Sequence, residues 1–342
     1  MGEVLPGVFI VRSPVFELLA SMFRLQSHER LSRSDSALAL DDFDLGLWVD
    51  RVRKVLDVDT REALRVFFDY ESYLGLAMIR YAWVNNAWDT VDHFVARLEE
   101  SSPDTLFAAL VQTGYVASDL DDAADAEQVR RYIQRASLPT LEKWKLAYLY
   151  LSMDDTKAQF IRLVRACYDS YFADEWDRLR LLQEASIQQL GTIQNRRGVL
   201  QRFPYLTGTF VEDVGTTLVA APSVFYHVDT FSSYHDQGSP LVITVYGTHY
   251  ADRSQPDTAE ALKILADETR IKIIKTLSAG PCFGFELAQR LNLSSSTISH
   301  HVALLSSVGV VTPTRQENRV SYELNRSELS RLMASLASAL GS

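Results

Sequence analysis

Five residues with hydroxyl or imidazole side chains stand close together near the C-terminal end of the chain. They are Ser295, Ser296, Thr297, Ser299 and His300. Ile298, Val302 and Leu305 recur among and after them at spacings of four and three residues, which places these apolar residues on one face of a helix. The polar residues then lie on the opposite face. Small hydroxyl and imidazole groups there could enter a major groove about 12 Å wide and hydrogen-bond to base edges or phosphates.

Two arginines follow in a segment that reads as a β-hairpin. Apolar residues alternate with polar ones after Arg319, and residues 310–314 form a matching run before Arg315. Both arginines are therefore predicted at the tip of a wing, where they could reach phosphates or the minor groove. The alternative is that the arginines only keep the turn soluble and that His300 makes a packing contact.

Two shorter helices must position this polar helix. Asp267 is a helix cap, and the apolar residues after it share one face until Gly280 and Pro281 end the helix. A second helix over residues 285–291 is followed by the turn 292–294, which is the spacing of a helix-turn-helix. The sequence therefore predicts a winged helix-turn-helix that binds double-stranded DNA. Its elements, in order, are two helices, a turn, the polar helix and a hairpin with arginines at its tip.

Four segments of this region resemble the ArsR family of winged-helix repressors. They are residues 267–270, 285–288, 294–301 and 309–311. The resemblance covers roughly residues 258–340 and implies a repressor that occupies operator DNA. It also implies a homodimer built through helices at about 257–265 and 326–340, with two recognition helices in successive major grooves about 34–36 Å apart.

The metal sites of the family find no match in this sequence. Metal-sensing members carry two thiols separated by one residue before the second helix, and the corresponding positions here are Phe283 and Phe285, with Cys282 one place earlier. The terminal helix over residues 327–340 contains neither His nor Asp. We therefore expect neither metal nor cofactor in the module, and we expect Cys282 to be a half-buried apolar residue.

Charge is distributed unevenly along the chain. The net charge is −10, but residues 257–342 hold 9 of the 34 Lys and Arg residues and 8 of the 44 Asp and Glu residues. This part therefore carries +1, and residues 1–256 carry −11. An acidic body repels phosphate, so DNA contact is expected only in the C-terminal module.

The 342 residues exceed what one hydrophobic core usually supports, so the chain is predicted to fold as several units. The fold class is mainly α with small β. The expected domain boundaries follow from two kinds of signal. Helices are predicted to start at Ser13-Pro14 and Ser102-Pro103, and strands are predicted in the β-branched runs at 216–219, 224–228 and 241–246. We expect a helical N-terminal domain over 1–206, a β-rich segment over 207–250 packed on it, with residues 8–11 as an added strand, a linker over 251–256, and the winged helix over 257–342.

The sequence gives little support for enzymatic activity or for a metal site. No nucleotide-binding or hydrolase motif occurs, so we do not expect an enzyme. Two further sets of residues each have two interpretations. Residues of the first set either lie at polar strand edges or bind a metal ion. Residues of the second set either pack in the core or line an effector pocket. The first set is His227, Asp229, His235, Asp236, His249 and Asp252, and the second is Tyr81, Trp83, Trp88, Trp144, Tyr148 and Trp176.

We expect a cytoplasmic protein with no membrane partner. The chain has only two cysteines, shows no signal-peptide pattern and contains no run of 18 apolar residues. An unknown effector at the N-terminal domain is expected to change DNA affinity. One alternative is that the winged helix binds protein, because no Lys or Arg occurs between Leu291 and Thr314. The N-terminal domain would then carry a separate binding or catalytic activity.

Overall fold

The structure is a computed structural model. It describes residues 2–35, 44–112, 120, 123–136, 138–203, 215–226, 230–235, 240–248, 258–293, 295–316 and 319–339. Among these residues, no helix combines the length and the apolar character that crossing a membrane requires.

Helices make up most of the N-terminal part. In chain order they are α1 (Pro14–Asp35), α2 (Leu45–Val55), α3 (Val58–Phe67), α4 (Leu74–Val84), α5 (Val91–Glu100), α6 (Pro103–Val111), α7 (Ala126–Arg135), α8 (Thr140–Leu151), α9 (Met153–Cys167), α10 (Ala173–Leu182), α11 (Glu184–Gly191) and α12 (Arg196–Arg202). A π-helical turn, Tyr168–Phe172, joins α9 to α10.

The two predicted helix starts are both present. The Ser13 hydroxyl accepts a hydrogen bond from the Phe16 amide at 3.0 Å, and Pro14 occupies the first turn of α1, where its missing amide hydrogen costs nothing. Helix α6 likewise begins at Pro103 after Ser102.

A five-stranded sheet joins the start of the chain to the β-rich segment. Its strands are β1 (Glu3–Leu5), β2 (Val8–Ile10), β3 (Thr217–Ser223), β4 (Thr230–His235) and β5 (Leu241–Gly247), in the order β1-β2-β3-β5-β4. Strands β2, β3 and β5 run parallel, with Phe9 opposite Val219 and Val219 opposite Ile243. The expected pairing of residues 8–11 with this segment is therefore present. The antiparallel strands β1 and β4 form the edges.

One predicted strand is wrong. Val224, Phe225 and Tyr226 form a bend after β3, and residues 227–229 lie outside the described part of the chain. All three are buried, so their apolar character reflects packing under the helices and not strand pairing.

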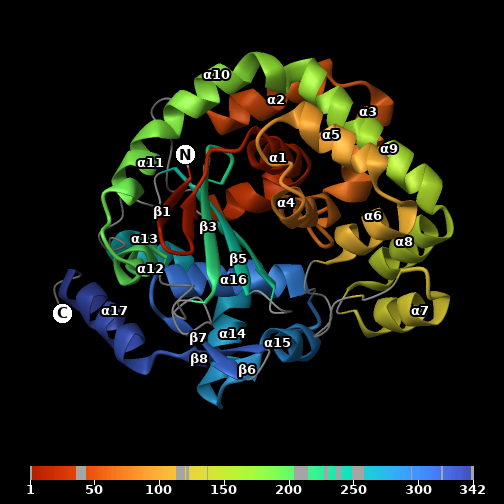
Figure 1. The fold of residues 1–342 in the computed structure, drawn as a ribbon. Coiled ribbons are helices and arrows are strands. Elements are labelled where there is room, and N and C mark those ends of the chain that lie inside the picture. Colours follow the sequence, from red (N-terminus) through yellow and green to blue (C-terminus); the bar gives the residue numbers. More distant parts are fainter. Residues whose placement is uncertain are drawn as a thin grey trace.

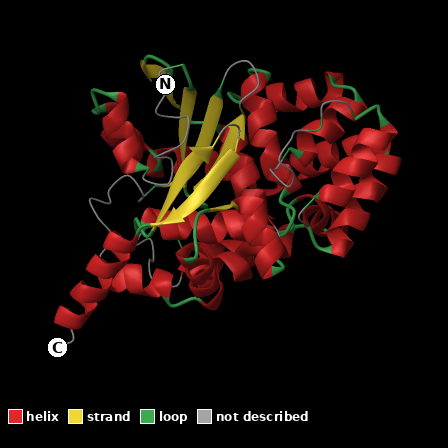
Figure 2. Cartoon of the chain, turned by 90° about the horizontal axis from the view of Figure 1, so that it is seen from below, coloured by secondary structure: helices red, strands yellow, loops and turns green. Residues whose placement is uncertain are grey.

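The two faces of the sheet are buried in different clusters. Val219 and Val245 belong to the large core of α1 to α10, whereas Leu218 and Val242 pack with α11 and α12. Burial on both faces explains why β3 and β5 are almost continuously apolar, as central parallel strands are. Figure 2 shows the main group of helices on one side of this sheet.

The aromatic residues considered for an effector pocket divide into two groups. Tyr81, Trp83, Trp88 and Trp176 pack in or against the large core, and the Trp83 and Trp88 rings stack at 5.6 Å. Trp144 and Tyr148 instead lie on the outer face of α8, 70% and 68% exposed, so they do not pack in the core. Leu146 and Leu149, on the opposite face of α8, are the apolar residues that it buries.

Candidate nucleic-acid interface

The C-terminal region contains all the elements that the sequence predicts for a winged helix. They are α13 (Thr258–Leu265), α14 (Glu268–Ser278), β6 (Cys282–Phe283), α15 (Gly284–Leu291), α16 (Ser295–Ser307), β7 (Val311–Gln316), β8 (Arg319–Leu324) and α17 (Arg326–Ala339). The three strands form a sheet in the order β6-β8-β7. Strand β6 was not expected, because two residues are too few to show an alternating pattern.

Local contacts fix the helix ends. The Asp267 carboxylate accepts a hydrogen bond from the Arg270 amide at 2.9 Å and so caps α14. Asn292, with φ 54° and ψ 47°, adopts the left-handed conformation that ends α15 and turns the chain into α16. Gly309, with φ 73°, ends α16, and a Cβ there would also lie 3.1 Å from Cγ of Glu328.

The predicted apolar face of α16 packs on its own module. Ile298, Val302 and Leu305 are buried in a core formed by the C-terminal elements alone. This core is separate from the two clusters of the N-terminal part. Helix α16 is therefore oriented as the sequence predicts, with its polar side turned away from the module.

Five of the predicted DNA-contacting residues are placed as follows. Ser295 and Ser296 form the first turn of α16, and Ser299 is exposed. In the wing, Arg315 pairs with Val320 and Arg319 pairs with Gln316, so both arginines lie near the ends of β7 and β8. Residues 317 and 318 between them lie outside the described part, as do the side chains of Ser295, Ser296, Arg315 and Arg319.

The expectation that Thr297 and His300 face solvent is wrong in this conformation. Thr297 is only 8% exposed and His300 is half-buried. The Thr297 hydroxyl donates a hydrogen bond to Oε2 of Glu71 at 3.0 Å, and the His300 ring lies edge-on to Tyr70 at 5.7 Å. Both residues contact the N-terminal domain, which is distant in sequence, so helical periodicity could not have revealed the contact.

A third contact joins Tyr73 to the same face. Burial raises the pKa of Tyr73, the nearby Tyr322 of β8 raises it further, and a hydrogen bond with Ser299 lowers it. Burial also raises the pKa of Tyr322 to about 12. Both phenols are therefore neutral at physiological pH, and the contact between Tyr73 and α16 is a hydrogen bond without charge.

Figure 1 shows the result of these contacts in the fold. Helix α16 lies beside the lower end of the five-stranded sheet, between the N-terminal part and the other helices of the module. The edge strand β4 also contacts α16. The surface expected to bind DNA is thus at an interface within the chain.

The structure describes only part of the candidate metal ligands. Cys282 is buried, its sulfur accepts a hydrogen bond from Nη1 of Arg290 at 3.2 Å, and Phe283 stacks on Phe285 at 5.7 Å. Of the His and Asp residues in the β-rich segment, only His235 belongs to the described residues. Over the described ranges, no three His, Cys, Asp or Glu side chains come together as a metal site.

The two helices α15 and α16, the turn between them and the β7-β8 hairpin define a winged helix-turn-helix protein. The model of a family described as "Bacterial regulatory protein, arsR family" matches residues 267–312. The arsenical resistance operon repressor of Staphylococcus aureus is 31% identical over 83 residues, which are 24% of this chain and 80% of that protein. The chain therefore belongs to the ArsR family.

Two further relatives carry regulatory names. The HTH-type transcriptional regulator CmtR of Mycobacterium tuberculosis is 36% identical over 74 residues, 22% of this chain and 63% of CmtR. The transcriptional repressor SdpR of Bacillus subtilis is 33% identical over 67 residues, 20% of this chain and 74% of SdpR. The match thus spans somewhat less than two thirds of CmtR, and in every case less than a quarter of this chain.

Proposed function

We propose that the chain is a sequence-specific DNA-binding transcriptional regulator that acts as a homodimeric repressor. The observation that carries this proposal is the polar side of α16. This side faces away from the core of the module, because Ile298, Val302 and Leu305 pack into that core. The neighbouring hairpin has an arginine on each of its two strands. The membership of the ArsR family supports DNA as the partner. A reporter gene behind the bound promoter would distinguish repression from activation.

In this proposal the residues of α16 read the major groove and the wing contacts the backbone. Ser295, Ser296, Thr297, Ser299 and His300 provide the hydrogen-bonding groups for the groove. The region from Leu291 to Thr314 contains no Lys or Arg, so Arg315 and Arg319 would supply much of the contact with phosphates or the minor groove.

Replacing both wing arginines, Arg315→Ala with Arg319→Ala, is expected to weaken DNA binding and to lower the slope of log K against log salt by about two. The reason is that each lost phosphate contact releases one condensed counterion fewer. Fluorescence anisotropy with a labelled duplex from upstream of the encoding gene, titrated at several salt concentrations against a shuffled duplex, measures both quantities.

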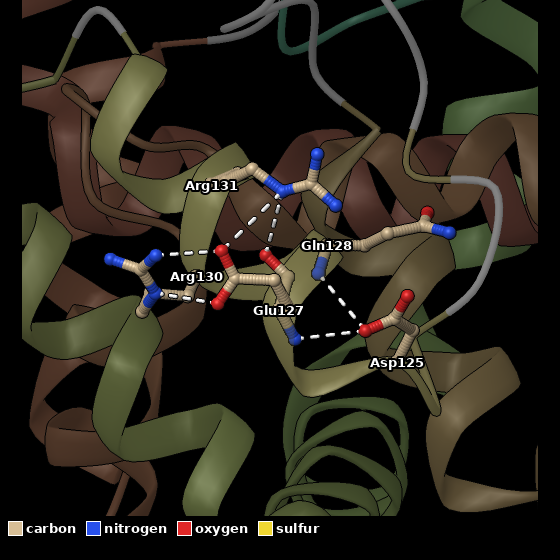
Figure 3. A network of polar contacts seen from close by, with 5 residues as sticks. All are labelled: Asp125, Glu127, Gln128, Arg130 and Arg131. Atoms are coloured by element: carbon tan, nitrogen blue, oxygen red, sulfur yellow. Dashed lines mark hydrogen bonds and ion pairs between the residues drawn. The ribbon is translucent and has the colours of Figure 1, made fainter.

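A matched control removes the same charge elsewhere. Arg130 and Arg131 on α7 are exposed and both contact Glu127, the Arg130 Nε at 2.9 Å from Oε2 (Figure 3). Arg130→Ala with Arg131→Ala should leave affinity and salt slope almost unchanged. An equal loss in both double variants, or binding that ignores the DNA sequence, would count against a specific role of the wing.

The dimer is proposed through α13 and α17, as the family resemblance implies. These helices contact one another, and α17 extends away from the rest of the chain in both views (Figures 1 and 2). Met333 on α17 is 51% exposed although Leu332 beside it is buried. An apolar side chain in that position fits an interface between two copies.

Met333→Glu is expected to shift the mass in sedimentation velocity from twice 38.6 kDa towards 38.6 kDa, because a buried charge at the interface has no partner. Ser327→Glu, at an exposed position of the same helix that lies about 120° round it from Met333, should leave the dimer intact. A wild-type chain that sediments as a monomer at all concentrations would contradict the proposed dimer.

We further propose that an effector at the N-terminal domain, a small molecule or a protein, sets the DNA affinity of this cytoplasmic regulator. Direct contact between that domain and α16 supports this, and a coupling of about 1–3 kcal/mol would change affinity roughly 5-fold to 150-fold. The same contact also favours the alternative that the winged helix binds protein. The absence of DNA binding by every variant described here would favour that alternative.

A further inference from the structure

We infer that residues 69–73, here called the 69–73 turn, are an autoinhibitory surface that occupies the DNA-reading face of α16 and that DNA must displace. This inference rests on the proposed function, because it takes α16 as the helix that reads DNA. The turn connects α3 to α4 in the N-terminal domain and is 226 positions from its contact in α16.

Three side chains of the turn reach α16, and each meets a residue that we expect to contact DNA. Tyr70 packs edge-on against His300, at an interplanar angle of 77°. Glu71 accepts the hydrogen bond from Thr297 at 3.0 Å.

The third side chain, Tyr73, hydrogen-bonds to Ser299 and lies close to Tyr322 of the wing strand β8. Positions 297 and 300 lie one helical turn apart on the same side of α16, and position 299 lies about 100° further round the helix from 300, so the three contacts reach two neighbouring sides of α16. A duplex cannot reach Thr297 while the turn is in place, because this residue is only 8% exposed and its hydroxyl is bonded to Glu71.

The turn is held rigidly in shape by its own first residue. The Asp69 carbonyl accepts hydrogen bonds from the amides of Ser72 at 3.3 Å and Tyr73 at 2.7 Å, and the Asp69 carboxylate accepts one from the Glu71 amide at 2.8 Å. Lys145 of α8 donates to the Ser72 hydroxyl at 2.8 Å. The turn therefore loses little conformational entropy when its side chains contact α16, whereas a flexible loop would lose more.

Helix α1 supports the same two side chains from behind. The guanidinium group of Arg30 lies 5.3 Å from the centre of the Tyr70 ring and forms an ion pair with Glu71. Tyr70 also stacks on Phe23 at 6.4 Å, and Phe23 belongs to the large core. The inhibitory contact is thus connected to the large hydrophobic core of the N-terminal domain.

Backbone conformation gives an independent sign that the turn is specialised. Tyr73 has φ 28° and ψ 40°, a left-handed conformation that a bulky residue rarely adopts. Such conformations persist only where the surroundings fix them, and they concentrate at functional positions. The strained backbone places the Tyr73 ring where it meets α16 and β8 together.

The chemistry of the contact resembles that of the ligand it excludes. A carboxylate oxygen of Glu71 accepts the Thr297 hydrogen bond that a phosphate oxygen or a base acceptor would take in a complex with DNA. Because the closed chain cannot bind DNA, the apparent affinity equals the intrinsic affinity multiplied by the fraction of open chains.

The test is Tyr70→Ala with Glu71→Ala in the full chain, with Glu71→Gln as a second variant that preserves the size of the side chain. We expect the double variant to bind the labelled upstream duplex about tenfold more tightly, and Glu71→Gln to change affinity in the same direction by less. Glu62→Ala, on the exposed side of α3, removes the same charge and should have almost no effect.

A second readout follows opening without DNA. Cys167 and Cys282 are both buried, so a thiol introduced by Thr297→Cys reacts with a maleimide ahead of them. We expect the labelling rate to rise with Tyr70→Ala and Glu71→Ala by about the factor gained in DNA affinity, because both report the open fraction.

The outcomes separate the two levels of the proposal. Equal DNA affinity for the wild type, the double variant and Glu62→Ala, with faster labelling only in the double variant, would overturn autoinhibition and leave DNA binding standing. An unchanged labelling rate would overturn it as well. Faster labelling with no DNA binding by any chain would overturn the proposed function itself.

Discussion

Glu17→Gln is expected to stabilise the protein by about 4 kcal/mol at pH 8, because it removes an ionisable group that is neutral only in the folded state. Glu17 lies in the first turn of α1 and is buried against the end of β3. Burial raises its pKa from 4.5 to about 8, and the hydrogen bond from the Val224 amide offsets only part of that rise.

The sign follows from proton binding. Between pH 4.5 and 8 the folded chain keeps the Glu17 proton, whereas the unfolded chain loses it. The contribution to stability is therefore fully present below pH 4.5 and is lost as the pH rises to about 8. Glutamine is neutral throughout and can still accept the hydrogen bond from the Val224 amide, which Glu17 accepts at 2.8 Å.

Urea unfolding at intervals from pH 5 to pH 8.5 measures this difference. The wild type should lose stability with rising pH relative to Glu17→Gln, and the two should converge at the acid end. Glu62→Gln, at an exposed position of α3, is the control and should follow the wild type. Parallel pH profiles for the wild type and Glu17→Gln would show that the buried carboxyl group does not titrate in this range.

Leu305→Ala is expected to destabilise the C-terminal module by about 2–5 kcal/mol and to abolish specific DNA binding. Leu305 is fully buried in the core that holds α16 against the rest of the module. Truncation leaves a cavity beneath the recognition helix, and the neighbouring residues Val302 and Ile298 can fill it only partly. The loss should be confined to the module, because its core is separate from those of the N-terminal part.

Leu98→Ala provides the matched control. Leu98 on α5 is equally buried, but in the large N-terminal core. Calorimetry should show the two substitutions lowering different transitions, with DNA binding retained by Leu98→Ala below its transition. One common transition, shifted equally by both, would mean that the module does not unfold as a unit of its own.

The sequence by itself determined the elements whose residues interact over short distances along the chain. Asp267 caps α14, Ser13 and Pro14 start α1, and the spacing of Ile298, Val302 and Leu305 fixes which side of α16 faces the module. These features are local, since a cap reaches three residues and a helical face repeats every three or four. The family resemblance rests on the same local patterns. The domain boundaries and the residues expected to contact DNA stay predictions.

Tertiary structure alone decided what covers each surface. Thr297 donates a hydrogen bond to Glu71, which is 226 positions away in the sequence. The residues around Thr297 therefore could not predict this contact. Trp144 and Tyr148 are exposed because α8 packs through Leu146 and Leu149, although large aromatics are usually buried. Periodicity shows which residues of a helix share a face, but the neighbour of that face depends on how distant segments pack, and here it is the N-terminal domain that covers the recognition helix.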